Sequence, residues 1–197
     1  MIARRFNGLL LLCCLMAMSA CTQKKENNLE IRIHYPNVQV KLDPHRMEDA
    51  YSMMIVMQLY RGLLRFNPTG DTVPDLAESW TESADRKTYR FKLRDATFSN
   101  GEKITAKHVQ YSFARIFILG SGIAADIDYI KGTKEFLKSK DLKDFGVKAN
   151  SDQEVEFQLA YPSALFFKHV AVADCAIMPF ANLEKITESP TAFSGPY

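Results

Sequence analysis

The chain has few cysteines, no long apolar run and no excess of charge of one sign. Three of its four cysteines, Cys13, Cys14 and Cys21, lie within the first 21 of 197 residues, so Cys175 has no partner for an internal disulfide in the rest of the chain. The apolar run at 8–20 is too short to span a bilayer comfortably. Residues 22–197 contain as many basic as acidic side chains, which argues against a nucleic-acid-binding protein.

The sequence also lacks the common catalytic and nucleotide-binding motifs. Its four histidines are scattered, with no HExxH and no histidine–cysteine cluster at zinc spacing. There is no GxxxxGK[ST], no GxGxxG after a predicted strand and no GxSxG. We therefore expect no enzyme activity, no metal site and no cofactor.

Two pairs of residues could be taken for catalytic groups and are better explained otherwise. Cys175 follows His169 by six residues, but it lies in the apolar run VAVADCAIM, which predicts a buried and inert thiol. Glu48 and Asp49 are adjacent, and adjacent side chains diverge on a helix or strand, so they make a poor acid–base pair.

Residues 50–61 predict the first helix. Asp49 or Ser52 can cap its start, and Gly62 follows its last turn. Several methionines in and before this helix could suggest a soft-metal site, but helical spacing and the gap-filling use of methionine predict core packing instead. The apolar stripe is Met53, Val56, Met57 and Tyr60, and the methionines are Met47, Met53, Met54 and Met57.

Alternating apolar residues predict strands at 29–35, 38–42, 88–94 and 154–160. The outward residues of the third strand are basic and those of the fourth are acidic. Pairing of these two strands would place opposite charges face to face, which adds about 0.2–1 kcal/mol per pair. Their inward-facing residues are Tyr89, Phe91, Leu93, Val155, Phe157 and Leu159.

The remaining segments mix helices and strands without a regular βαβ rhythm. Thr105 can cap a helix whose apolar stripe is Val109, Phe113, Ile116 and Phe117. We also expect a short strand after Gly62, a helical turn before Trp80, helices at 125–137 and 163–170, a strand at 175–179 and a short helix to about residue 187. The sequence therefore predicts an α/β fold of the mixed α+β kind.

The N-terminal 21 residues predict where the protein is located. Arg4 and Arg5 precede the apolar run, and small residues follow it, as in a secretory signal. The sequence Met18-Ser19-Ala20-Cys21 resembles the bacterial lipobox, which implies a signal peptide at 1–20, lipid on Cys21 and a lipidated tether at 21–28. The alternative is an ordinary signal peptide cut elsewhere, which leaves a free cysteine.

Several motifs, taken together and in order, resemble those of the family-5 extracellular solute-binding proteins of ABC importers, such as the oligopeptide- and dipeptide-binding proteins. They are KLDPHRMED, LYRGLLRFNPTG, VPDLAESWTES, KTYRFKLRDATFSNGEKITAKHVQYSFARI and FSGPY, and they cover most of residues 38–197. The resemblance implies a periplasmic-binding-protein type II-like fold that is incomplete here. The chain would hold the start of lobe I (29–50), an inserted second domain (51–188) and a truncated return into lobe I (189–197).

The resemblance also implies a function and a site. The protein would capture a solute, most simply a peptide, outside the inner membrane and deliver it to an ABC permease, as a lipid-anchored monomer in the periplasm or at the cell surface. The segment after LDPH would meet the peptide backbone, which here means Met47, Glu48, Asp49 and Ala50. One alternative is a protein of the same family that binds another solute (a nickel chelate, haem or an oligosaccharide). The other is a free-standing surface lipoprotein without transport.

The chain departs from the family pattern at three places. Asn100 replaces an aspartate, and Lys107-His108 replaces an acidic residue, both of which we expect to be surface changes. The stretch after Arg115 is shorter than in the family, and the aromatic residue that can contact peptide in that region of the family has no match here.

Overall fold

The computed structural model describes residue 34 and residues 39–180, 182–186 and 188–195. The chain divides into two units, 1–36 and 37–197, and the fold below is that of the second unit. The predicted signal peptide, tether, Cys21 and nearly all of the strand at 29–35 lie outside the described residues. Within the described part of the chain, no helix is long and apolar enough to cross a membrane.

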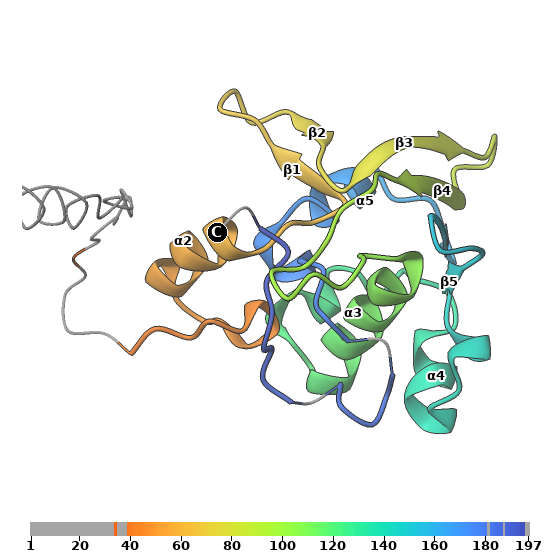
Figure 1. Cartoon of the computed structure of the whole chain (residues 1–197). Coiled ribbons are helices and arrows are strands. Elements are labelled where there is room, and N and C mark those ends of the chain that lie inside the picture. Colours follow the sequence, from red (N-terminus) through yellow and green to blue (C-terminus); the bar gives the residue numbers. More distant parts are fainter. Residues whose placement is uncertain (1–33, 35–38, 181, 187, 196–197) are drawn as a thin grey trace, which may run out of the picture. The chain divides into compact units, whose positions relative to one another are not determined.

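The central element is a four-stranded antiparallel sheet in the order β3-β4-β6-β5 (Figure 1). Its strands are β3 (Ala77–Glu82), β4 (Thr88–Leu93), β5 (Val147–Ala149) and β6 (Glu154–Gln158). Two of them are the strands predicted from alternation, and their predicted pairing is confirmed, with Phe91 opposite Val155. The predicted inward residues of β4 and β6 are all buried.

The charges facing one another across β4 and β6 behave as predicted for one pair and differently for the other. Arg90 lies opposite Glu156, and its Nε is 2.7 Å from the carboxylate. Lys92 lies opposite Glu154, but its Nζ pairs instead with Glu78 on β3, at 2.9 Å. The sheet therefore connects its charged residues across three strands.

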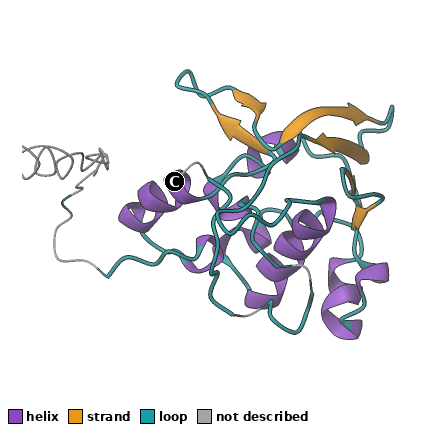
Figure 2. Cartoon of the chain, viewed as in Figure 1, coloured by secondary structure: helices purple, strands orange, loops and turns teal. Residues whose placement is uncertain are grey.

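The helix α3 (Ala106–Leu119) packs against β5 and β6 and completes the main core (Figures 1 and 2). It begins at Thr105 as predicted, and its predicted stripe is buried, with the Phe113 ring 4.8 Å from that of Phe157. Gly120, in the left-handed conformation, ends the helix. Arg115 lies in the C-terminal half of this helix, and its side chain is surrounded by other segments of the chain.

Three shorter helices and a hairpin surround this core. They are α2 (Ala50–Leu59), α4 (Thr133–Ser139), α5 (Phe166–His169) and the antiparallel pair β1 (Leu64–Phe66) and β2 (Thr72–Pro74). Four 3₁₀ turns, η1 to η4, occupy Pro44–Arg46, Gly122–Ala125, Leu142–Asp144 and Ala173–Cys175. The predictions of α2, β1 and a short helix within 163–170 are confirmed.

Two predicted helical segments are wrong. The turn expected before Trp80 is part of β3, because β4 supplies a ladder in which Trp80 pairs with Phe91. The helix expected at 125–137 is a turn followed by α4, because Gly132 has φ +73 and interrupts the helix. Tertiary pairing and one glycine outweigh local preference at these places.

Three predicted elements near the chain ends are also absent from the described residues. The stretch 175–179 forms no strand, since Ile177 N donates to the Arg61 carbonyl (2.8 Å) and Met178 N to Ser112 Oγ (2.8 Å) rather than to a neighbouring strand. Residues 182–186 are turns rather than a helix, and 39–42 is not a strand. At 39–42, Lys41 N donates to Ser52 Oγ of α2 at 2.9 Å rather than to the carbonyl of a neighbouring strand.

The methionines of α2 are exposed, which contradicts the prediction that they pack in the core. Met53, Met54 and Met57 are 41%, 55% and 57% exposed. Val56 of this helix and Tyr60 just after it enter a second apolar cluster, with Ala176, Met178 and Phe180, against which Leu59 of the helix and Met47 also pack. Helix α2 therefore buries a narrow stripe.

Candidate functional site

The predicted ligand segment begins at a tight turn whose geometry follows from its sequence. Asp43 is extended, and its Oδ1 accepts the His45 N–H at 3.1 Å, so that it caps the turn η1. Pro44 occupies the first position of the turn, where its fixed φ fits and its missing N–H is not needed. Sequence and local structure agree here, and Asp43-Pro44 fixes how the chain enters residues 45–47.

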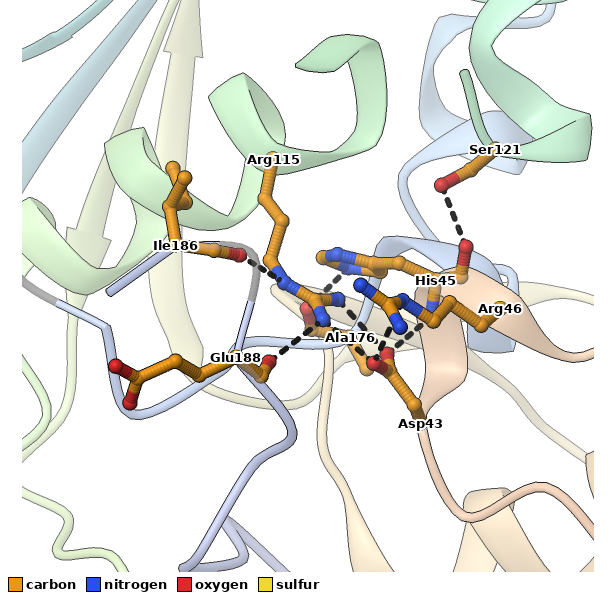
Figure 3. Close-up of polar contacts among 8 residues, drawn as sticks. All are labelled: Asp43, His45, Arg46, Arg115, Ser121, Ala176, Ile186 and Glu188. Carbon is orange, nitrogen blue, oxygen red and sulfur yellow. Dashed lines mark hydrogen bonds and ion pairs between the residues drawn. The ribbon is translucent and has the colours of Figure 1, made fainter. Parts of the chain in front are cut away.

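The carboxylate of Asp43 also forms a buried ion pair with Arg115 of α3 (Figure 3). Nη1 and Nη2 of Arg115 donate to Oδ1 and Oδ2 of Asp43 at 2.8 and 2.5 Å. The same guanidinium donates to the carbonyls of Ile186 (2.5 Å) and Glu188 (3.1 Å), and it lies 5.2 Å from the centre of the Phe180 ring. Arg115 is fully buried, and this group, the Arg115 clamp, joins three distant parts of the chain.

Burial and the nearby charge of Arg115 set the ionisation of the two groups beside it. Burial opposes ionisation of Asp43, but its hydrogen bond and ion pair with Arg115 outweigh burial and lower the pKa of this carboxyl. Burial, together with the Arg115 charge, lowers the pKa of His45 to about 3. Asp43 is therefore a carboxylate and His45 a neutral imidazole at neutral pH.

His45 fastens the turn from two further sides. Its Nε2 lies 3.3 Å from the Ala176 carbonyl, and Ser121 Oγ donates to the His45 carbonyl at 2.7 Å (Figure 3). Its Nδ1 and the Tyr60 hydroxyl are buried without a hydrogen-bond partner among the described residues. The turn thus has fixed contacts with α3, with the Gly120–Gly122 turn and with the segment after η4.

The predicted site residues follow directly and differ in their roles. Met47 is extended, at φ −73 and ψ 145, and packs on the second apolar cluster. Glu48 is exposed, with its carboxylate 2.9 Å from Lys41 Nζ. Asp49 is extended and caps α2 by accepting the Ser52 N–H at 2.9 Å, as predicted, while Ala50 is the first residue of the helix. Met47–Asp49 is therefore a short extended bridge between two fixed points.

Two hollows lie along η1 and α2, the elements that this bridge joins. One, of about 830 Å³, is lined by Met47 and Glu48 but not by Asp49 or Ala50. Its other walls are Lys41–Arg46, Leu119–Gly122 and the segment 189–193. The second hollow, of about 860 Å³, lies against α2 and is lined by Met53, Met57 and residues of β1 and the 171–176 segment. Both volumes suit a small ligand or a short peptide.

Comparison with known proteins identifies the family. Residues 71–197 match the model of a protein family described as "Bacterial extracellular solute-binding proteins, family 5 Middle". The chain belongs to this family. It is 35% identical over 156 residues to the periplasmic oligopeptide-binding protein OppA of Escherichia coli (strain K12), an alignment that covers 76% of this chain and 28% of OppA.

Solved structures of family-5 relatives show the same fold. An oligopeptide-binding protein (OppAIV) of Borrelia burgdorferi has a TM-score of 0.71 and 30% identity, over 79% of this chain and 33% of that one. A protein from A. tumefacien R10, AgaA, in complex with agropinic acid, has a TM-score of 0.65 and 25% identity over 79% and 30% of the two chains. The predicted family and fold are confirmed, and the chain spans about a third of the length of these relatives.

The family-5 relatives are solute-binding proteins, and the described residues contain no catalytic pair in the places where the sequence suggested one. The Cys175 thiol is buried, and burial raises its pKa, as predicted for an inert thiol. The Nδ1 of His169 lies 3.0 Å from the Tyr129 hydroxyl. Glu48 and Asp49 have separate partners, Lys41 and Ser52.

His108 is not the surface change that the sequence predicted. It is 3% exposed, its Nδ1 accepts the Thr105 N–H at 3.1 Å and its Nε2 lies 3.2 Å from Glu102. It therefore takes the position of the glutamate in a capping box at the start of α3. Burial lowers its pKa, which keeps the accepting nitrogen unprotonated.

The folded protein is expected to lose stability as the pH falls below about 6.5. The folded-state pKa of His45 is about 3, below the ordinary value of 6.5, so between these values the unfolded chain binds a proton that the folded chain does not. Each pH unit in this window costs up to about 1.4 kcal/mol for this group. Urea denaturation at pH 7.0, 5.5 and 4.5 measures the slope. His45→Gln should flatten it, and an equal slope in that variant would contradict the assignment.

Proposed function

We propose that this chain is the N-terminal part of the peptide-capturing component of an ABC importer. In that proposal, Cys21 carries the lipid anchor outside the inner membrane, the protein acts as a monomer, and a membrane permease receives the solute. The domain bounds expected from the family pattern (29–50, 51–188 and 189–197) belong to the same proposal. The relatives that carry peptide-binding names support peptide as the solute.

One observation carries this function. Met47 and Asp49 have extended backbones on either side of Glu48, between a buried ion pair and a helix cap, and Glu48 lines a hollow. No hydrogen bond of the Glu48 backbone with another described residue is found. An extended backbone with free polar groups can pair with an extended peptide as one strand pairs with another. Such pairing recognises the main chain and tolerates many side chains.

Main-chain recognition predicts different outcomes for two substitutions of Glu48. Glu48→Ala should leave peptide affinity within about threefold, because the side chain is exposed and its ion pair with Lys41 is solvated. Glu48→Pro removes the N–H and should weaken binding about tenfold or more. Met47, at ψ 145, already has the conformation that precedes a proline, so the fold should tolerate the change. Calorimetric titration of the full-length gene product with a mixed peptide library measures both.

The intact mass of the protein from its native host tests the fragment and the anchor together. A mass well above that of this chain, with a lipid on the N-terminal cysteine, supports an anchored importer component. A mass equal to Cys21–Tyr197 plus lipid favours the second candidate, a free-standing surface lipoprotein without transport.

The other candidate is a family-5 protein for a different solute, a class the sequence left open as a nickel chelate, haem or an oligosaccharide. The structural neighbour that binds agropinic acid supports a solute other than a peptide. A thermal-shift panel of peptides and these solutes separates the candidates, because only a true ligand raises the melting temperature as its concentration grows.

A further inference from the structure

The Arg115 clamp connects the ligand segment to parts of the chain that do not touch it. Four of the donor contacts available to a guanidinium are used: two to the Asp43 carboxylate, one to the Ile186 carbonyl and one to the Glu188 carbonyl (Figure 3). Asp43 lies 72 residues from Arg115 in the sequence, and Glu188 lies 73 residues away. One side chain of α3 therefore sets the spacing between two segments from opposite ends of the chain.

The position of the ligand segment depends on this contact. The same Asp43 carboxylate that binds Arg115 accepts the His45 N–H and so shapes the turn η1, and Met47 follows the last residue of that turn. At the other end, Asp49 caps α2, and α2 is anchored through Val56 and through Leu59, whose carbonyl accepts the Gly195 N–H at 2.8 Å. Three residues, Met47 to Asp49, separate η1 from α2, so a displacement of η1 passes to the Glu48 backbone.

A buried ion pair of this kind is better explained by geometry than by stability. Replacing both partners of such a pair by apolar residues of similar volume is often neutral or stabilising, because the desolvation of two charges offsets their attraction. The planar guanidinium, with its fixed set of donors, determines relative positions in a way that an apolar contact does not.

We propose that Arg115 is a positioning residue for ligand capture: it does not touch the ligand but holds Met47–Asp49 in the register in which the Glu48 backbone can pair with it. This inference rests on the proposed function. It predicts that substitutions at Arg115 weaken binding by loosening the segment, since a preordered partner loses less entropy on binding.

The test compares two variants of the full-length gene product with the wild type. Arg115→Lys keeps the charge but loses the two-pronged contact, and Asp43→Leu/Arg115→Met replaces the pair by apolar side chains of similar size. Three quantities are measured: the melting temperature, the affinity for a mixed peptide library, and hydrogen exchange without ligand of the Arg46 and Ser52 amides, which flank the segment and donate to the Asp43 carbonyl (3.0 Å) and the Asp49 carboxylate (2.9 Å). Arg90→Met is the matched control, because it removes the Arg90–Glu156 ion pair of the sheet.

The proposal expects a separation between stability and binding. The double variant should melt above Arg115→Met, because no charge is left unpaired, and below the wild type, because the Ile186 and Glu188 carbonyls still lose a donor. It should bind about tenfold more weakly than the wild type and exchange the amides of Arg46 and Ser52 about tenfold faster. Arg115→Lys should show the same loss of binding. Arg90→Met should change neither the affinity nor the exchange of these amides.

Each other outcome counts against the proposal or against the function on which it rests. If the folded double variant keeps the peptide affinity of the wild type and exchanges the Arg46 and Ser52 amides as slowly, Arg115 has a structural role only. A double variant that does not fold would also overturn the proposal, because the pair would then be needed for stability. If the wild type binds no peptide, the proposed function fails, while the exchange of the Arg46 and Ser52 amides still decides whether Arg115 positions the segment.

Discussion

Replacing Arg115 alone with methionine is expected to lower the free energy of unfolding by about 3–5 kcal/mol. The substitution leaves the Asp43 carboxylate, whose side chain is only 10% exposed, without its ion partner. The carbonyls of Ile186 and Glu188 lose a donor in the same step. Urea denaturation followed by circular dichroism at pH 7 measures the loss.

The matched control is Arg90→Met, which also removes an arginine–carboxylate pair. Arg90 is 54% exposed although Glu156 is only 9% exposed, and Glu156 keeps the hydrogen bond from Gln158 Nε2 (2.7 Å), so the expected loss is smaller, about 1–2 kcal/mol. The deficit of the Arg115→Met variant relative to the wild type should also shrink near about pH 4, because protonation of Asp43 removes the unpaired charge. Equal losses in the two variants would show that burial of the Arg115 pair has no energetic consequence.

Gly132→Ala is expected to lower the free energy of unfolding by about 2–5 kcal/mol, from about 1–2 for the left-handed backbone and about 1–3 for overpacking. Gly132 has φ +73, and a Cβ there would lie 1.7 Å from the backbone oxygen of Asp144. Because a backbone atom cannot rotate away as a side chain can, α4 or the 3₁₀ turn that carries Asp144 must shift.

Gly70→Ala separates the two causes of this loss. Gly70 has φ +84, but a Cβ there would meet no atom within 4 Å, so only the backbone cost of about 1–2 kcal/mol applies. Thermal and urea denaturation of both variants give the difference that belongs to the close approach. If Gly132→Ala cost no more than Gly70→Ala, the close packing of Gly132 against Asp144 would be contradicted.

The methionines of α2 show where sequence patterns mislead. Helical spacing correctly predicts the helix and its cap at Asp49, since both depend on neighbouring residues. It does not predict which face is covered, because that depends on segments far away in the chain. The packing stripe is reduced to Val56 and Tyr60 by the position of Ala176–Phe180, and Met53, Met54 and Met57 remain exposed.

The candidate site shows the same division. The LDPH-like motif led to Met47–Ala50, and the structure adds the extended backbone of Met47 and Asp49 and the hollow beside Glu48. The sequence analysis assigned no role to Arg115 or to the carboxylate of Asp43. Arg115 is a polar residue beside an apolar stripe, and such a residue is usually expected to face solvent.

The sequence by itself determined the family, β4 and β6 with their inward faces, and the start of α3 at Thr105. These follow from motifs, from alternation and from caps, which act between residues close together in the chain. Only the tertiary structure decided that β3 replaces a helical turn at Trp80, that His108 is buried and that Arg115 joins Asp43 to Ile186 and Glu188. The physical reason is that a ladder partner, burial and a buried ion pair are set by residues tens of positions away, whose proximity no local pattern encodes.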